Sequence, residues 1–293
     1  MKSLNSYQRG LLMTAIGVLI LTPDALLIRL VETDHWTLVF WRSLFSAACL
    51  FILSAFIEKN SPVKAFQRIV KNGLLCALLF SGNNVFFVLS ITHTTAANTL
   101  VILASMPFIG AVLTVVLLRK NMPLRTWLAI FLCMIGIVIV FWGRFGDGNI
   151  EGDIYALLTA LCMAGTLVAV NFNPKIDTLA VIGLGCLLSA LFALNMGASP
   201  LEVSSVDLFY LFINGTVVFA IAMALITFGP KLIPAPEVSL VMLMETILGP
   251  LWVWLVFSEE PHRQTFIGGA IVITAILINA ALGIRSSRSK KVL

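Results

Sequence analysis

The sequence has 293 residues, of which 59% are hydrophobic and only 11% are charged. So few charges cannot solvate the surface of a soluble protein of this length. The composition therefore excludes a water-soluble chain and indicates a lipid environment. The net charge of +5 does not indicate nucleic-acid binding, because the basic residues are spread among short loops rather than gathered on one face.

Apolar runs long enough to cross the ~30 Å core of a bilayer occur ten times along the chain. The first begins near Gly10 and is about twice as long as the apolar core of a signal peptide, so it is expected to be a retained span. The predicted fold class is therefore an all-α integral membrane protein with ten transmembrane helices. In chain order the predicted spans are 10–30, 36–57, 72–91, 95–118, 124–142, 153–173, 178–197, 207–229, 235–258 and 264–284.

Basic residues predict the orientation of these spans. With the N-terminus in the cytoplasm, 15 of the 19 Lys and Arg residues fall in inner segments, two fall in outer loops, and two lie within spans. Cytoplasmic loops of membrane proteins carry this excess of positive charge. We therefore expect a multi-pass protein of the inner (plasma) membrane with both termini in the cytoplasm.

The two halves of the chain are weakly similar. Laying 95–139 over 234–278 without a gap superposes two spans and the turn between them, which is basic in the first half and acidic in the second. Five spans per half would insert the second half upside down, and its turn would then face outside, where basic residues are disfavoured. Two inverted repeats with a site between them are common in secondary transporters. The predicted domains are a first five-helix repeat, 10–142, and a second, inverted five-helix repeat, 153–284.

Three motifs follow one another in these spans. They are Phe40-Trp41-Arg42 in the second, Ser105-Met106-Pro107-Phe108 in the fourth, and Met244-Glu245-Thr246-Ile247-Leu248-Gly249-Pro250 in the ninth. In this order and spacing the chain resembles the drug/metabolite transporter superfamily, specifically its ten-helix bacterial exporters with paired EamA domains. The resemblance implies a central substrate cavity that opens alternately to each side. The chain departs from the family pattern at Thr246, where a proline that breaks the helix is usual.

Ionisable groups at membrane depth cost ~2.5–3.5 kcal/mol each on insertion scales, so each calls for a partner or a function. At ~1.5 Å per residue, Asp24 lies roughly 21 Å from the inner start of the first span and Arg42 roughly 9 Å from the outer start of the second. These depths nearly match, so the two side chains are predicted to interact. They either form a structural ion pair or exchange partners with a substrate group or a proton during transport.

Glu245 lies near the middle of the ninth span, with no basic residue at the same depth of that helix. It is either an acid that hydrogen-bonds between helices or a group that binds substrate or protons during transport. Asn83 and Asn84 share a midplane position and point ~100° apart, so one is expected to line the cavity and the other to bond a neighbouring helix. Asn214 either bonds between helices or lies on the pathway, and Met106, which aligns with Glu245 in the repeat, either packs as an ordinary core residue or shapes a cavity wall. The candidate residues of the substrate or coupling-ion pathway are therefore Asp24, Arg42, Asn83, Asn84, Met106, Asn214 and Glu245.

The predicted function is secondary-active transport, with export of a small metabolite such as an amino acid by alternating access. An uncoupled facilitator or channel on the same fold is the alternative, and a non-transporting assembly factor would not require these buried ionisable groups. An enzyme is not expected, because metalloprotease, serine-hydrolase and P-loop motifs are missing from the sequence. No cofactor or metal is predicted. The expected partners are a small-molecule substrate and lipid, with protons as the candidate coupling ion, and no nucleic acid.

Overall fold

The computed structural model describes residues 5–58, 73–94, 99, 102–141, 149–174, 176–257 and 263–289. Within this part of the chain the secondary structure is helical. The helices are α1 (Ser6–Leu21), α2 (Asp24–Arg29), α3 (His35–Glu58), α5 (Leu74–His93), α7 (Met106–Leu118), α8 (Leu124–Phe141), α9 (Ile150–Phe172), α10 (Thr178–Asn195), α11 (Ser205–Ile213), the π-helix η1 (Asn214–Ile221), α12 (Ala222–Phe228), the 3-10 helix η2 (Gly229–Lys231), α13 (Ala235–Phe257) and α14 (Arg263–Ser289).

These helices form ten membrane-spanning segments within the described residues. Seven are long and apolar enough to cross a bilayer, two shorter apolar helices are α7 and most of α8, and α13 is the tenth. The prediction of an all-α membrane protein with ten spans is confirmed, with boundaries that differ by a few residues. Parts of the predicted fourth span, at 95–98 and 100–101, lie outside the described residues.

Two predicted spans are not continuous helices. The first is interrupted by a turn at Thr22-Pro23, and the fourth has a turn at Ala104-Ser105 just before α7 begins. A proline lies at each break, Pro23 inside the first turn and Pro107 two residues after the second, and a proline has no N–H to continue the i→i−4 ladder. The ninth span, by contrast, is an unbroken helix through Thr246, the position where the family pattern has a proline.

Side-chain caps fix where several helices begin. Asn149 accepts from the backbone N–H of Glu151 at the start of α9, and Asp177 accepts from that of Ala180 at the start of α10. Each cap satisfies a backbone donor that has no partner inside its helix. Each cap comes directly before the apolar run of its helix and lies at an end of the bundle.

The helices of the two halves alternate in space. Three pairs join corresponding spans of the halves: α3 packs on α10, α7 on α13 and α8 on α14. The remaining strong contacts come in matched pairs, one contact being the equivalent of the other five spans along. The contact of α5 with α9 matches that of α1 with α12, the contact of α5 with α10 matches that of α3 with η1, and the contact of α7 with α9 matches that of α1 with α13. Exchanging every span with the one five places along leaves this pattern unchanged, so the halves build one shared body.

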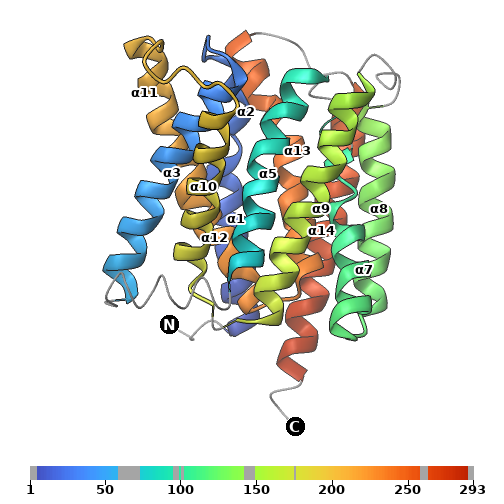
Figure 1. Ribbon diagram of the computed structural model, residues 1–293. Coiled ribbons are helices and arrows are strands. Elements are labelled where there is room, and N and C mark those ends of the chain that lie inside the picture. Colours follow the sequence, from blue (N-terminus) through green and yellow to red (C-terminus); the bar gives the residue numbers. More distant parts are fainter. Residues whose placement is uncertain are drawn as a thin grey trace.

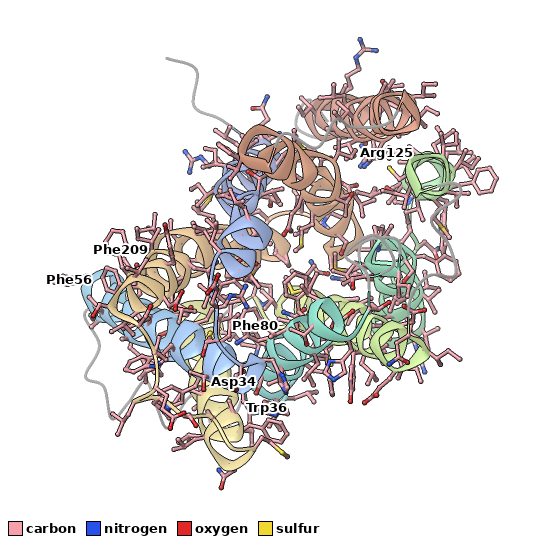
Figure 2. All side chains as sticks on the ribbon, turned by 90° about the horizontal axis from the view of Figure 1, so that it is seen from above. Asp34, Trp36, Phe56, Phe80, Arg125 and Phe209 are labelled. Carbon is pink, nitrogen blue, oxygen red and sulfur yellow. The ribbon has the colours of Figure 1, made fainter. Side chains whose placement is uncertain are left out.

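The bundle buries its centre and exposes apolar side chains around its rim. Phe80 is fully buried in the core, whereas Phe56 and Phe209 are 79% and 60% exposed and point away from the bundle (Figure 2). Exposed apolar side chains around a helical bundle are expected where lipid is the solvent. The start of α1 and the end of α14 lie at the same end of the bundle (Figure 1).

Candidate functional site

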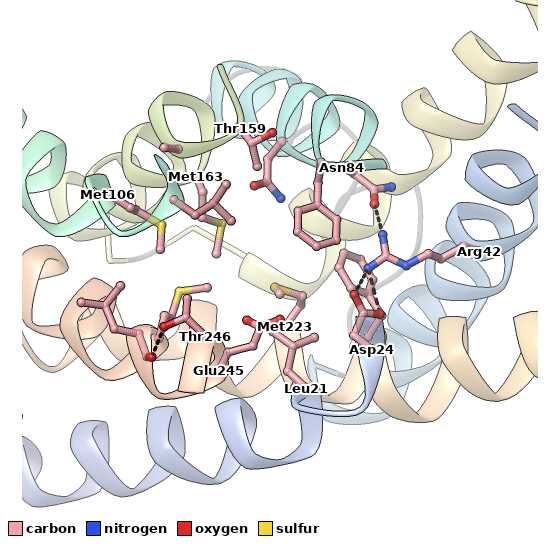
Figure 3. Close-up of a pocket in the computed structure, with 17 residues that line it drawn as sticks. Leu21, Asp24, Arg42, Asn84, Met106, Thr159, Met163, Met223, Glu245 and Thr246 are labelled. Carbon is pink, nitrogen blue, oxygen red and sulfur yellow. Dashed lines mark hydrogen bonds and ion pairs between the residues drawn. The ribbon is translucent and has the colours of Figure 1, made fainter. Parts of the chain in front are cut away.

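A cavity lies in the middle of the bundle. It lies between the halves, since α1, α2, α3, α5 and α7 contribute from the first and α9, η1, α12 and α13 from the second. The lining residues are Leu21, Asp24, Arg42, Asn83, Asn84, Phe87, Leu103, Met106, Thr159, Ala160, Met163, Phe219, Met223, Met242, Leu243, Glu245 and Thr246 (Figure 3).

Asp24 and Arg42 form an ion pair at one side of this cavity (Figure 3). The Arg42 Nη2 atom donates to both carboxylate oxygens of Asp24, at 3.0 and 2.8 Å. The two side chains are only 2% and 1% exposed. The prediction that they interact is confirmed. Because both side chains are buried away from water, each charge is compensated by the other.

The break in the first span places Asp24. Because the helix stops at Thr22-Pro23, Asp24 becomes the first residue of α2, where exposed backbone N–H groups favour a negative charge. The break is held from α13, whose Trp252 donates its indole N–H to the Thr22 hydroxyl at 2.9 Å. A continuous helix over 10–30, as predicted from the sequence, would not have put Asp24 at a helix start.

The π-helix η1 supplies two further contacts to Arg42. Arg42 Nε donates to Asn214 Oδ1 at 2.9 Å, and its guanidinium carbon lies 3.9 Å from the centre of the Phe219 ring. Phe219 follows Asn214 by five positions. On an α-helix two such side chains would point ~140° apart, whereas the i→i+5 hydrogen bonds of a π-helix bring them to the same side of the helix. Asn214 also donates to Asp24 Oδ1 at 2.9 Å, as expected of an interhelical asparagine. It belongs to the network beside the cavity rather than to the cavity wall.

Asn83 and Asn84 divide their roles as expected. Asn84 accepts from Arg42 Nη1 at 2.7 Å and donates to the hydroxyl of Ser43 at 2.7 Å, so its carboxamide is bound to α3. Asn83 lines the same cavity and is 92% buried, since 8% of it is exposed. Within the described part of the chain Asn83 makes no side-chain hydrogen bond.

Glu245 points into the cavity from the middle of α13 and is partly exposed to it (Figure 3). Its carboxyl group has no hydrogen bond or ion pair to any described residue. The neighbouring Thr246 hydroxyl donates back to Leu243 O at 2.7 Å, a bond within the same helix. Met106 is buried at the start of α7 and forms part of the wall, as predicted. Glu245 is thus the ionisable group of the cavity that remains available to a ligand.

A second buried charged cluster lies near the end of the bundle that holds the start of α1 and the end of α14, and sequence reasoning missed it. Glu237 is 1% exposed; it accepts from Arg125 Nη2 at 2.8 Å and from the Tyr7 hydroxyl at 2.5 Å. Arg125 also donates to the backbone oxygen of Asn279. Glu237 also lies in the first turn of α13, where a negative charge offsets the helix dipole. The sequence did contain a signal for this pair, which is matching depth. Glu237 and Arg125 each lie about two residues in from the same end of their spans.

Comparisons with known proteins agree with this architecture. A family model described as the EamA-like transporter family matches residues 8–142 and 150–281. The chain is 25% identical over 242 residues to an S-adenosylmethionine uptake transporter of Rickettsia bellii (strain RML369-C), covering 81% of each chain. It is 23% identical over 256 residues to an uncharacterized transporter, YetK, of Bacillus subtilis (strain 168), covering 81% of this chain and 76% of the other. One crystal structure, 14% identical, shares the fold with a TM-score of 0.77 over 93% of this chain and 97% of the other.

Proposed function

The chain belongs to the EamA-like transporter family, and from this premise we propose that it is a secondary-active carrier for a small metabolite with a cationic group. The observation that carries the proposal is the carboxyl group of Glu245, which faces the central cavity without a partner among the described residues. A buried carboxylate without a counter-ion is costly, so a cation or a proton that neutralises it is favoured there. Amino acids and their derivatives supply such a cation in their amino group.

The Asp24–Arg42 pair at the side of the cavity is a weaker candidate for substrate binding. Arg42 already donates to Asp24, Asn84 and Asn214, and its flat face is covered by Phe219. A substrate would have to break these contacts before it could bind the guanidinium group. We propose that this network holds the helices around the cavity in register, while Glu245 alternates between substrate and proton.

Alternating access fits the arrangement of the two halves. We propose that residues 10–142 and 153–284 are inverted repeats, because the packing pattern is unchanged when the spans of one half are exchanged for those of the other. A site between inverted repeats near the midplane can open to either side as one repeat rocks against the other. We place both termini in the cytoplasm and the protein in the inner membrane, on the charge distribution of the loops.

S-adenosylmethionine is the first substrate to test. The relatives from Rickettsia bellii and Rickettsia prowazekii that are 25% and 24% identical to this chain are named as its uptake transporters. This molecule carries a sulfonium and an amino group, either of which is a suitable partner for Glu245. A carrier with one alternating site runs in the direction that its gradients set, so uptake by those relatives and the export predicted from the family resemblance can share one mechanism.

Transport by purified protein in proteoliposomes tests the role of Glu245. In Glu245→Gln the side chain keeps its size but loses its charge and its proton site. If Glu245 couples transport to protons, exchange of labelled substrate continues in the variant, while accumulation driven by a pH gradient is lost. If Glu245 binds the substrate, both are lost. The matched control is Glu202→Gln, which makes the same change at an exposed position between α10 and α11 and leaves transport unchanged.

Two results would overturn this assignment. Normal accumulation by Glu245→Gln at every pH would show that Glu245 is a structural acid. Wild-type transport that equilibrates the substrate but ignores every ion gradient would identify the alternative, an uncoupled facilitator on the same fold.

A further inference from the structure

Two adjacent asparagines of α5 line the cavity, but only one of them is bonded. The Asn84 carboxamide is held by Arg42 and Ser43. Asn83 is 92% buried and lines the same cavity, yet its side chain has no partner in the described part of the chain. Every fully buried side-chain N or O atom of the described residues has a hydrogen-bond partner, so the unbonded polar atoms of Asn83 keep some exposure, and the cavity provides it. Its free donor and acceptor therefore face the space that a substrate would fill.

Asn83 and Glu245 lie on different sides of that space. Asn83 belongs to α5, which packs mainly on α9 and α10, while Glu245 belongs to α13, which packs mainly on α7 and α1 and less closely on α9. Figure 3 shows the α5 residue Asn84 and the α9 residue Thr159 on one side of the cavity and Glu245 on the other. The two unpartnered polar groups of the cavity can therefore contact opposite ends of one molecule.

The wall of the same cavity carries several methionines. Met106, Met163, Met223 and Met242 all contribute to it. Thioethers adapt to irregular shapes and make favourable contacts with aromatic rings. A flat ring is therefore a suitable occupant for the middle of the cavity.

We propose that Asn83 determines specificity, and that the preferred substrates are cations whose flat ring carries a hydrogen-bond donor and acceptor side by side, as in a primary amide or an amino-substituted heteroaromatic ring. A carboxamide matches such an edge with two hydrogen bonds, as asparagine does on adenine. The inference rests on the proposed function for the cation and adds the recognition of the opposite end. A ring without this edge leaves the Asn83 amide buried and unpaired, so it binds more weakly.

Three small probes separate the two ends of the site. They are 1-methylnicotinamide, a cationic ring with an amide edge, 1-methylpyridinium, the same cationic ring without the edge, and nicotinamide, which has the edge but no charge. Dissociation constants are measured on the full chain in detergent by competition with one radiolabelled probe. We expect wild-type protein to bind 1-methylnicotinamide about tenfold more tightly than 1-methylpyridinium, and nicotinamide more weakly than 1-methylnicotinamide.

Substitutions assign each preference to its residue. In Asn83→Leu, which keeps the shape, the tenfold preference falls to about one while 1-methylpyridinium binds as before. Glu245→Gln weakens both cations and leaves their ratio unchanged. The control Asn195→Leu removes a carboxamide at the end of α10, bonded to Leu191 O and outside the cavity, and changes neither value. Asn83→Ser serves as a second variant if Asn83→Leu does not fold.

Each result decides between the two ideas. Equal wild-type affinities for the two cations overturn the inference but leave the proposed cation site standing. A preference that survives Asn83→Leu also overturns it. If nicotinamide binds as tightly as 1-methylnicotinamide and Asn83→Leu abolishes its binding, Asn83 reads the edge but the proposed cation site fails. If none of the three probes binds, both ideas fail.

Discussion

The Asp24–Arg42 pair gives a quantitative prediction about stability. Both side chains are almost fully buried, and Arg42 has two other acceptors, Asn84 and Asn214. Removing one partner of a buried ion pair costs ~3–5 kcal/mol, because the other charge is left without compensation. We expect Asp24→Asn to cost about 3 kcal/mol, the lower end of this range, because the two amide oxygens still accept from the guanidinium. Arg42→Gln should cost more, about 4–5 kcal/mol, because Asp24 then keeps only the Asn214 amide as a side-chain donor.

The double substitution removes both charges at once. We expect the free energy of unfolding of the double variant, Asp24→Asn with Arg42→Gln, to be only slightly lower than that of Arg42→Gln alone. The loss of stability in the double variant is then ~2–3 kcal/mol smaller than the sum of the losses in the two single variants. The measurement is unfolding of the purified protein in mixed micelles by titration with SDS, followed by tryptophan fluorescence.

A surface pair serves as the control, and the outcome can refute the reasoning. Tyr155 donates to Glu151 at 2.8 Å on the exposed side of α9. Its cycle, Tyr155→Phe with Glu151→Gln, should give a coupling below about 0.5 kcal/mol. If the Asp24 and Arg42 substitutions are strictly additive, the pair seen in the structure does not contribute to stability as a unit.

Two further predictions concern the ends of the bundle. In a variant without native cysteines, Ser204→Cys should react with an impermeant thiol reagent on intact cells, while Ser286→Cys should react only after the membrane is opened; the reverse pattern would show that the orientation is wrong. Glu237→Gln should lower the free energy of unfolding by ~3 kcal/mol or more, because it leaves the partly buried guanidinium of Arg125 without its counter-ion. An unchanged SDS titration curve would show that this cluster does not stabilise the fold.

The sequence by itself determined how deep each group lies in the membrane. Apolar runs must match the thickness of the bilayer, and a helix advances a fixed distance per residue, so counting residues gives depth. Depth was enough to predict the pairing of Asp24 with Arg42 and the presence of Asn83 and Glu245 at the level of the cavity. The even number of spans also predicts that both ends of the chain lie on one side of the membrane.

Only the tertiary structure decided which way each side chain turns at its depth. Spans that are apolar all round carry little information about their inward face, because lipid and protein interior are equally apolar solvents. The sequence therefore left open that Asn84 bonds α3 while Asn83 stays free, and that Glu237 meets Arg125. It also gave no sign of the π-helix that turns Phe219 onto Arg42, because the rotation of that segment is set by its packing against α3.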